Sequence, residues 1–350
     1  MSKYQTREVV KAAVNLSGSD RDTLIDRVIE DASREIDNLT NRFFIPKTEV
    51  RYYPWPQRNG RGYVLFIDDV DLLSVSALTK DGTDVTAIAA ADYFLEPVNE
   101  TRKWRIEIDL ASSAFFANKN TRQRAIAVTG SWGYDNQSAS IGTVVSGLGT
   151  GTTATSMVCS NGAAVGVGDT LLIESEQVEV TDKTTVDSGV NESGALTASV
   201  TDTTVTFSGV PTTAVNVGEV ILIDSERMRI RDVTSTTVVV VERAYDGTTL
   251  ATHANAADIY IYRTLTIVRG VNGTTAATHA NATAASRYVV PGDISGLCLA
   301  LAAAYYQAGR GGWTGEITGG DTVIETRMSA LAKKREEVRK HYRRFALAAV

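Results

Sequence analysis

Hydrophobic positions close to the N-terminus recur at the spacing of an α-helix. They form one stripe, which a helix over residues 20–43 would bury. Ser19 followed by Asp22 is a loose capping box at the start of this helix, and Pro46 ends it. The stripe consists of Leu24, Ile25, Val28, Ile29, Ala32, Ile36, Leu39 and Phe43.

Short runs with the patterning of β-strands follow the helix. Aromatic and β-branched residues are frequent in them, and turns such as 80–83 separate them. We interpret residues 1–140 as a helix followed by a small sheet. The predicted strands are 50–53, 63–67, 93–95, 105–108 and 125–132.

The segment 141–287 is rich in Thr, Val, Ala, Gly and Ser, has no helical period, and contains two repeated motifs. Motif A, Val165-Gly-Val-Gly-Asp-Thr-Leu-Leu-Ile-Glu-Ser-Glu-Gln-Val, recurs from Val215 at an offset of 50. Motif B starts at Arg243 and again at Arg269, an offset of 26, and both copies contain Thr-His-Ala-Asn. Self-similarity of this kind is typical of repeated structural modules.

The order of the motifs is A, A, B, B, whereas a tandem duplication would give A, B, A, B. One complete unit, 188–263, is therefore predicted to lie inside a turn of an outer unit made of 141–187 and 264–287. Alternating strands with Asp-Gly and Asn-Gly turns indicate a small β-sandwich or barrel in each unit. One continuous sheet built from both repeats is the alternative.

The last segment, 288–350, returns to helical patterning. Pro291 precedes an Ala-rich helix over 293–308, and a Gly-rich stretch, 311–320, leads to a final helix over 324–346. The narrow apolar face of that helix consists of Ile324, Met328, Leu331, Val338, Tyr342 and Phe345. The opposite face is basic and carries Lys333, Lys334, Arg335, Arg339, Lys340, Arg343 and Arg344.

Four segments outside the repeat are informative when they are taken in order. The first is the helix that ends in Asn41-Arg42-Phe43-Phe44, and the second is Arg51-Tyr-Tyr-Pro-Trp-Pro. The third is the strand from Arg124 that ends in Gly133-Tyr134, and the fourth is Val290-Pro-Gly-Asp-Ile with its helix ending in Tyr305-Tyr306. In this order they resemble the head-tail connector (adaptor) family of long-tailed double-stranded-DNA bacteriophages. In that family the strand ending in Gly-Tyr leads almost directly into the Pro-led helix. We therefore interpret 141–287 as an insertion at a loop tip.

The resemblance implies an α+β fold, with a helical connector core, a small β-sheet and the all-β nested repeat as an insertion. It also implies a structural virion protein of the neck, made in the host cytoplasm. Members of the family form a homo-oligomeric, dodecameric ring beneath the portal protein. The ring extends the DNA channel, touches packaged double-stranded DNA transiently, and receives the next tail component, a terminator or stopper.

Charge and composition narrow the function further. Lys and Arg against Asp and Glu number 18 to 20 in residues 1–140, 8 to 15 in 141–287 and 9 to 6 in 288–350, so only the C-terminal segment is basic. A nucleic-acid-binding domain is normally basic over a whole face. The two cysteines do not suggest a disulfide framework, and we expect neither a signal peptide nor a membrane span.

Catalytic and metal-binding patterns are missing from the sequence, so we predict no enzyme, cofactor or metal site. His253 and His279 occupy equivalent places in motif B, and a repeated position favours a turn-stabilising role over a base or ligand. The repeated acids of motif A suggest calcium ligands, but strand alternation favours a solvated face. These acids are Glu174, Glu176, Asp224 and Glu226.

The candidate partner-binding residues lie in the C-terminal helix and two loops. We expect the seven basic residues, with Tyr342 and Phe345, to dock on an acidic surface of the portal. Trp55, Arg58, Arg61 and Trp313 are predicted in loops that face a neighbouring subunit or the tail. The three long helices are predicted to bury their apolar stripes between neighbouring subunits. The alternatives are a β-repeat that binds host-surface carbohydrate, and a glycan-cleaving enzyme, which would need two facing carboxylates.

Overall fold

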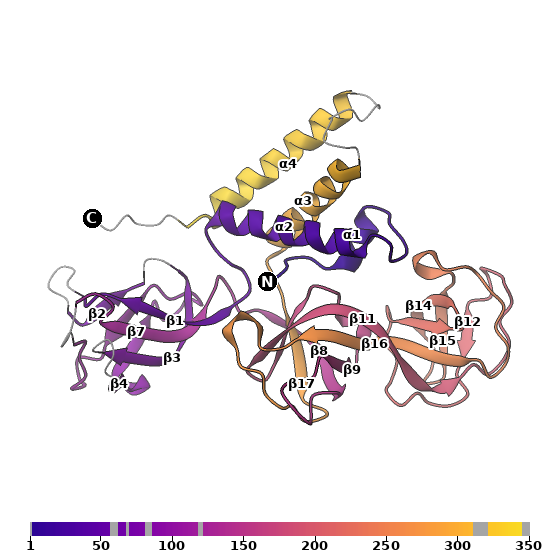
Figure 1. The fold of residues 1–350 in the computed structure, drawn as a ribbon, viewed down its shortest axis with the longest axis horizontal. Coiled ribbons are helices and arrows are strands. Elements are labelled where there is room, and N and C mark those ends of the chain that lie inside the picture. Colours follow the sequence, from indigo (N-terminus) through magenta and orange to yellow (C-terminus); the bar gives the residue numbers. More distant parts are fainter. Residues whose placement is uncertain are drawn as a thin grey trace.

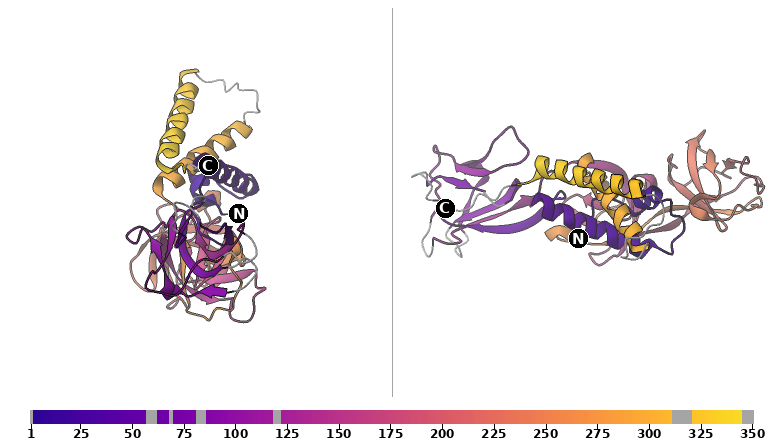
Figure 2. Two further views of the ribbon diagram at one scale, coloured as in Figure 1. Left: turned by 90° about the vertical axis from the view of Figure 1, so that its left-hand side faces the viewer. Right: turned by 90° about the horizontal axis from the view of Figure 1, so that it is seen from above.

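The computed structural model describes residues 2–56, 62–67, 70–80, 86–117, 122–310 and 321–344. A layer of helices lies over a row of three β units (Figure 1). Seen from above, the molecule is elongated, with the first β unit at one end and the third at the other (Figure 2).

The helical layer joins the two ends of the chain. It contains α1 (Arg7–Ala13), α2 (Asp22–Thr40), α3 (Gly292–Arg310) and α4 (Asp321–Tyr342). The apolar stripe of α2 packs on α3, and Ile25, Ile29 and Leu297 are fully buried. α2 ends three residues earlier than the pattern predicts, because Asn41 adopts the left-handed conformation (φ 52°) that often closes a helix.

The first β unit, here called the small β domain, leaves and rejoins the helical layer through paired strands, Lys47 lying opposite Trp132. Its two sheets, β1-β7-β3-β4 and β2-β6-β5, enclose one core around Leu72, Ile106 and Trp132. The strands are β1 (Lys47–Tyr53), β2 (Val64–Phe66), β3 (Leu72–Lys80), β4 (Thr86–Ile88), β5 (Tyr93–Glu96), β6 (Arg105–Ile108) and β7 (Ile126–Trp132).

The second β unit is a closed six-stranded barrel, here called the outer barrel. Its strands pair in the order β11-β10-β17-β8-β9-β16, and β16 pairs with β11 to close the ring. The strands are β8 (Ser138–Ser146), β9 (Ser156–Cys159), β10 (Thr170–Ile173), β11 (Glu176–Asn191), β16 (Asp258–Val268) and β17 (Ala284–Tyr288). The barrel leaves and rejoins the helical layer at one place, where Val289 N donates to Gln137 O at 2.9 Å.

The third β unit, the nested barrel, grows from the outer barrel through two shared strands. β11 and β16 run through both units, and β16 continues into the order β13-β14-β15-β12. A bridge between Glu192 and Phe207 brings the end of β12 back to β11. The added strands are β12 (Thr204–Thr206), β13 (Val220–Ile223), β14 (Glu226–Val233) and β15 (Val238–Glu242).

Each barrel has its own hydrophobic core. The buried residues of one core all lie within 141–180 and 265–285, and those of the other within 190–261. The cores therefore follow the division into an outer and a nested unit. The backbone hydrogen bonding agrees instead with the alternative prediction of one continuous sheet, because a single ten-stranded sheet runs through both units.

The predicted fold class, a helical connector core with a small sheet and an insertion, is wrong. The chain is mostly β, and in the described residues its four helices form one layer beside sheets of ten, four and three strands. The sequence pattern underestimated the strands before Gly133, where β3 and β4 were not predicted. No helix in the described part of the chain is long and apolar enough to cross a membrane.

The described apolar residues of the long helices pack within one chain. Ile29 and Ile36 of α2, Leu301 of α3 and Val338 of α4 share one core. The prediction that neighbouring subunits bury these stripes is therefore wrong for the described residues, because the helices bury them against one another; Ile324, Met328 and Phe345 lie outside the described side chains.

Candidate partner-binding site

The basic residues of α4 divide into those that hold the chain together and those that face solvent. Arg335 forms an ion pair with Glu35 of α2 at 2.6 Å, and Arg344 forms one with Asp71 at 3.1 Å. The Nζ of Lys334 lies over Gly296 of α3, 2.9 Å from where a Cβ at that position would be. Arg335 and Arg344 therefore hold α4 and the residues after it on the rest of the chain, and Lys334 lies against α3.

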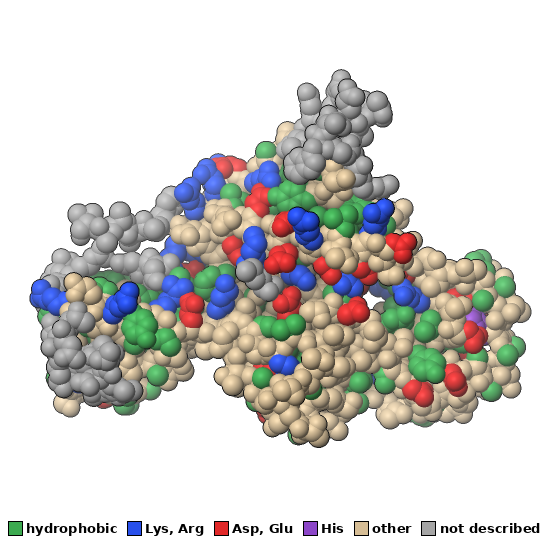
Figure 3. All heavy atoms as spheres, in the orientation of Figure 1, with side chains coloured by type: hydrophobic (Ala, Val, Ile, Leu, Met, Phe, Trp, Pro, Cys, Tyr) green, Lys and Arg blue, Asp and Glu red, His purple; other side chains and the backbone are tan. Residues whose placement is uncertain are grey.

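The solvent-facing side of α4 is formed by Lys333 and Lys340, whose side chains are 79% and 74% exposed. They lie within 4 Å of Glu337 and Glu336, and Arg339 binds Glu336 through two hydrogen bonds of 2.7 and 2.9 Å. Exposed pairs of this kind are weak and remain able to exchange partners. Figure 3 shows Lys and Arg side chains gathered on the helical layer and on the small β domain, and few on the two barrels.

Tyr342 is a core residue, so its prediction as a portal-docking residue is wrong. Its ring is 6% exposed and packs against Phe44 and Tyr134, with centroids 5.4 and 5.2 Å away. Burial raises the pKa of Tyr342 to about 12, and the nearby Asp293 carboxylate acts in the same direction. Phe345, Arg58, Arg61 and Trp313 lie outside the described residues.

Trp55 does not stand free in a loop. Its ring packs against the core of the small β domain, and its indole N–H donates to Phe116 O at 2.9 Å. The guanidinium of Arg122 lies 5.6 Å from the ring centroid. We therefore correct the prediction: Trp55 holds the loop before residue 57 and is only partly accessible to a partner.

The repeated acids of motif A do not share a solvated face. Glu174 and Asp224 have side chains that are 61% exposed, but Glu176 and Glu226 are fully buried. Each buried glutamate pairs across a two-residue turn with a buried isoleucine, which directs it into the barrel. The prediction of a solvated face is therefore wrong for these two acids.

Each buried glutamate is the centre of a cluster that links motif A to motif B. Glu226 accepts hydrogen bonds from Arg243 Nε and Nη2 at 2.8 and 2.9 Å, and one ring nitrogen of His253 lies 3.0 Å away. In the outer barrel Glu176 accepts two 2.6 Å hydrogen bonds from Arg269, and His279 lies 2.8 Å away.

Backbone N–H groups of motif B complete the two clusters. Ala244 and Ala251 donate to Glu226, and Gly270 and Ala277 donate to Glu176. Burial alone would raise the pKa of each glutamate, but the guanidinium, the histidine and these amides together lower it to about 2. Each cluster thus holds the motif B loop on its barrel through an ion pair and hydrogen bonds.

The histidines complete the clusters without an open position for a substrate. The second ring nitrogen of His253 lies 2.7 Å from Asp224, and that of His279 lies 2.8 Å from Glu174. Both rings are buried and occupied on both nitrogens. Sequence reasoning identified the histidines but missed Arg243 and Arg269. Each of these arginines is the first residue of its copy of motif B, and this shared position was the signal.

The turns fastened by the clusters face the helical layer. Asp246 accepts a hydrogen bond from Gly18 N and lies 3.6 Å from Lys11. The equivalent Asn272 of the outer barrel bonds Ser2 and Gln177. Both turns have the same left-handed backbone, with φ of 53° at Asp246 and 54° at Asn272. The repeated clusters therefore position repeated docking turns under the helices.

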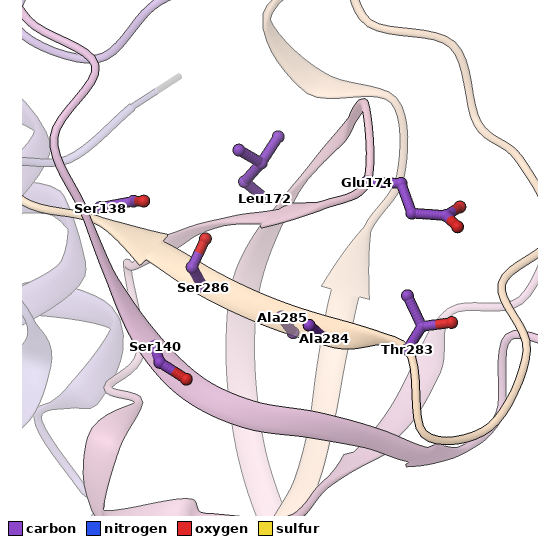
Figure 4. A pocket seen from close by; sticks show the side chains of 8 residues that line it. All are labelled: Ser138, Ser140, Leu172, Glu174, Thr283, Ala284, Ala285 and Ser286. Atoms are coloured by element: carbon purple, nitrogen blue, oxygen red, sulfur yellow. The ribbon is translucent and has the colours of Figure 1, made fainter.

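A shallow depression lies on the outside of the outer barrel, across β8, β17 and β10 (Figure 4). It is lined mostly by small side chains: Ser138, Ser140, Leu172, Glu174, Thr283, Ala284, Ala285 and Ser286. Carbohydrate sites usually offer aromatic rings, and this lining has none. Among the described residues, no group of three or more His, Cys, Asp or Glu side chains is placed to hold a metal ion.

Comparisons with protein-family models, with curated proteins and with solved structures found no match to this chain.

Proposed function

We propose that this chain is a structural subunit of a bacteriophage virion, an adaptor that forms a ring beneath the portal and joins the head to the tail. In this function the helical layer faces the portal through the solvent side of α4. The barrels project from the ring. The proposal includes passage of packaged DNA through the channel and attachment of the next tail component.

The convergence of the segments that carry the family resemblance supports this proposal. Tyr134 N donates to Phe43 O at 2.9 Å, and the Phe44 ring contacts Tyr134 with centroids 5.3 Å apart. Segments 41–44 and 133–134 thus meet in one aromatic cluster, which rests on α3 and α4. The barrels lie between Tyr134 and α3 in sequence, and they leave and return at one point, where Val289 N donates to Gln137 O.

The shape of the subunit also favours assembly into a ring. The two ends of the elongated subunit differ (Figure 2). Contacts between two different surfaces are head-to-tail, and these close into rings when the rotation fits. The small β domain, at one end, exposes several large apolar side chains, a composition typical of contact surfaces. Among the described residues these are Val50, Tyr52, Phe94, Val98, Trp104, Leu110 and Phe115.

Light scattering of the purified chain, alone and mixed with portal rings of the same virus, tests this proposal. We expect a defined multiple of the subunit mass on the portal. The double variant Lys333→Glu/Lys340→Glu should weaken binding, because it reverses the charges of the two exposed lysines of α4. Arg231→Glu, on the nested barrel, is the matched control and should bind normally. A chain that ignores the portal at every concentration would refute the adaptor function.

A further inference from the structure

Two arginines contact one aspartate where the helical layer joins the small β domain, and a third arginine shares the ring of Tyr134 with one of them. Arg42 follows α2, Arg344 follows α4, and Asp71 precedes β3. Arg42 Nη1 and Arg344 Nη1 each lie 3.1 Å from an oxygen of Asp71. Arg344 also donates to Ile67 O at 3.0 Å. The third arginine, Arg102, comes from the loop between β5 and β6.

Tyr134 supports two of these guanidinium groups. The Cζ of Arg102 lies 4.3 Å from the ring centroid of Tyr134, and that of Arg42 lies 5.1 Å from it. An aromatic face holds a cation in place without neutralising it. We call Arg42, Arg102 and Arg344, with Asp71 and Tyr134, the arginine junction.

The arginine junction carries an excess of positive charge. The three guanidinium groups and the one carboxylate of the junction sum to +2. Asp293 is not a member of the junction: it accepts a hydrogen bond from the hydroxyl of Tyr342 at 3.4 Å, and it forms no ion pair with the three arginines in the described part of the chain. Burial lowers the pKa of Arg42, and the charges of Arg102 and Arg344 lower it further against the opposing effect of Asp71.

Arg42 also lacks hydrogen-bond acceptors. Its side chain is 15% exposed, and its Nε and Nη1 are buried without an acceptor in the part of the chain that the structure describes. Nη1 approaches Asp71 without the direction of a hydrogen bond. A desolvated cation with unused donors is costly, and an added anion would offset that cost.

We propose that the arginine junction binds inorganic phosphate. Phosphate carries about −1.5 to −2 charges near pH 7, which matches the excess of the junction, whereas a carboxylate supplies only one. Guanidinium forks bind phosphate oxygens in pairs. Arg42 and Arg344 are only 15% and 13% exposed, which admits a small anion more readily than the backbone of a DNA duplex.

Bound phosphate would tie together α2, α4 and the small β domain, because each of the three arginines comes from a different one of these parts. The site therefore makes the stiffness of this joint dependent on an ion. This inference does not rest on the proposed adaptor function.

Titration of the full chain with inorganic phosphate, at an ionic strength held constant with sodium chloride, tests the proposal. Calorimetry should show saturable binding, and the thermal unfolding temperature should rise with it. Arg102→Ala should weaken binding at least about tenfold, because it removes a charge-assisted donor pair. Arg231→Ala removes an equal charge from the nested barrel and should leave binding unchanged.

Asp71→Asn separates a binding site from a merely structural joint. It removes the competing carboxylate and raises the local charge from +2 to +3, so phosphate should bind more tightly although the unliganded protein is less stable. This variant also decides the matter if Arg102→Ala does not fold. Absence of saturable binding, equal binding by Arg102→Ala and Arg231→Ala, or no gain with Asp71→Asn would overturn the proposal. Displacement of phosphate by a DNA duplex would overturn the assignment to the free ion.

Discussion

At the scale of single residues, the glutamates at the centres of the two barrel clusters form ion pairs that are buried. Glu226 is fully buried. It accepts hydrogen bonds from Arg243 and two backbone amides, and it contacts a ring nitrogen of His253. Its removal would leave a buried guanidinium without its partner, which is far more costly than the loss of a surface ion pair.

We therefore expect Glu226→Gln to lower the free energy of unfolding by about 3–5 kcal/mol, measured by urea denaturation. The control is Glu242→Gln, whose side chain pairs with Arg231 on the surface and is 42% exposed. It should cost at most about 1 kcal/mol. Equal losses in the two variants would show that the cluster is not a fastening.

The same glutamates predict a loss of stability in acid. Their pKa is about 2 in the folded chain and 4.5 ordinarily, so their contribution is complete above pH 4.5 and disappears as the pH falls towards 2. Thermal unfolding temperatures should decline over that window. The double variant Glu176→Gln/Glu226→Gln should decline less steeply than the natural chain, and identical slopes would contradict the assignment.

The sequence contained a signal for these clusters that strand alternation obscured. Glu, Arg and His recur at matched places in both copies of the motifs. A charged residue type that is repeated at the same position of a structural repeat indicates the same structural role in each copy. Alternation alone could not tell which face of a short strand is buried, because the direction of Glu176 depends on its pairing with Ile173 across the turn. The arginine junction gave no such signal, since its members come from separate segments.

At the scale of elements, the motif B turn Val271–Gly273 holds the outer barrel against β1. Gly273 adopts φ +78°, and a Cβ there would lie 2.0 Å from Thr48 O. Only glycine fits both the backbone conformation and the close approach. The repeat in the sequence predicted the turn itself. Its contact with β1 could not be predicted, because the contact depends on how the outer barrel packs against the small β domain.

We expect Gly273→Ala to destabilise the chain by about 1–3 kcal/mol, through strain in the turn and displacement from β1. Gly292→Ala, at the start of α3, has no atom within 4 Å of the added Cβ and serves as the control. Thermal unfolding of both variants measures the difference. A Gly273→Ala protein as stable as the control would contradict the tight contact between the turn and Thr48.

At the scale of the whole molecule, the nested barrel is an addition to a unit that is already closed. Asp187 and Tyr260 lie opposite each other in the paired strands β11 and β16. A two-residue turn can join such a pair. Motif order predicted the nesting, whereas the shared strands and the contact of Lys11 and Gly18 with the Asp246 turn depend on long-range packing that no local pattern encodes.

Replacing residues 188–259 by Asn-Gly should therefore leave a chain that folds. Its outer barrel keeps a core made only of residues outside the deletion. Cooperative thermal unfolding and dispersed methyl signals in NMR spectra are expected. A shortened chain that is unfolded or aggregated would show that the two barrels form one folding unit.

Electron microscopy of the chain mixed with portal rings of its virus tests the proposed adaptor function most directly. We expect class averages with a second ring beneath the portal, in which the helical layer faces the portal and the barrels project outward. Portal rings that remain bare at saturating concentrations of a folded chain would contradict it.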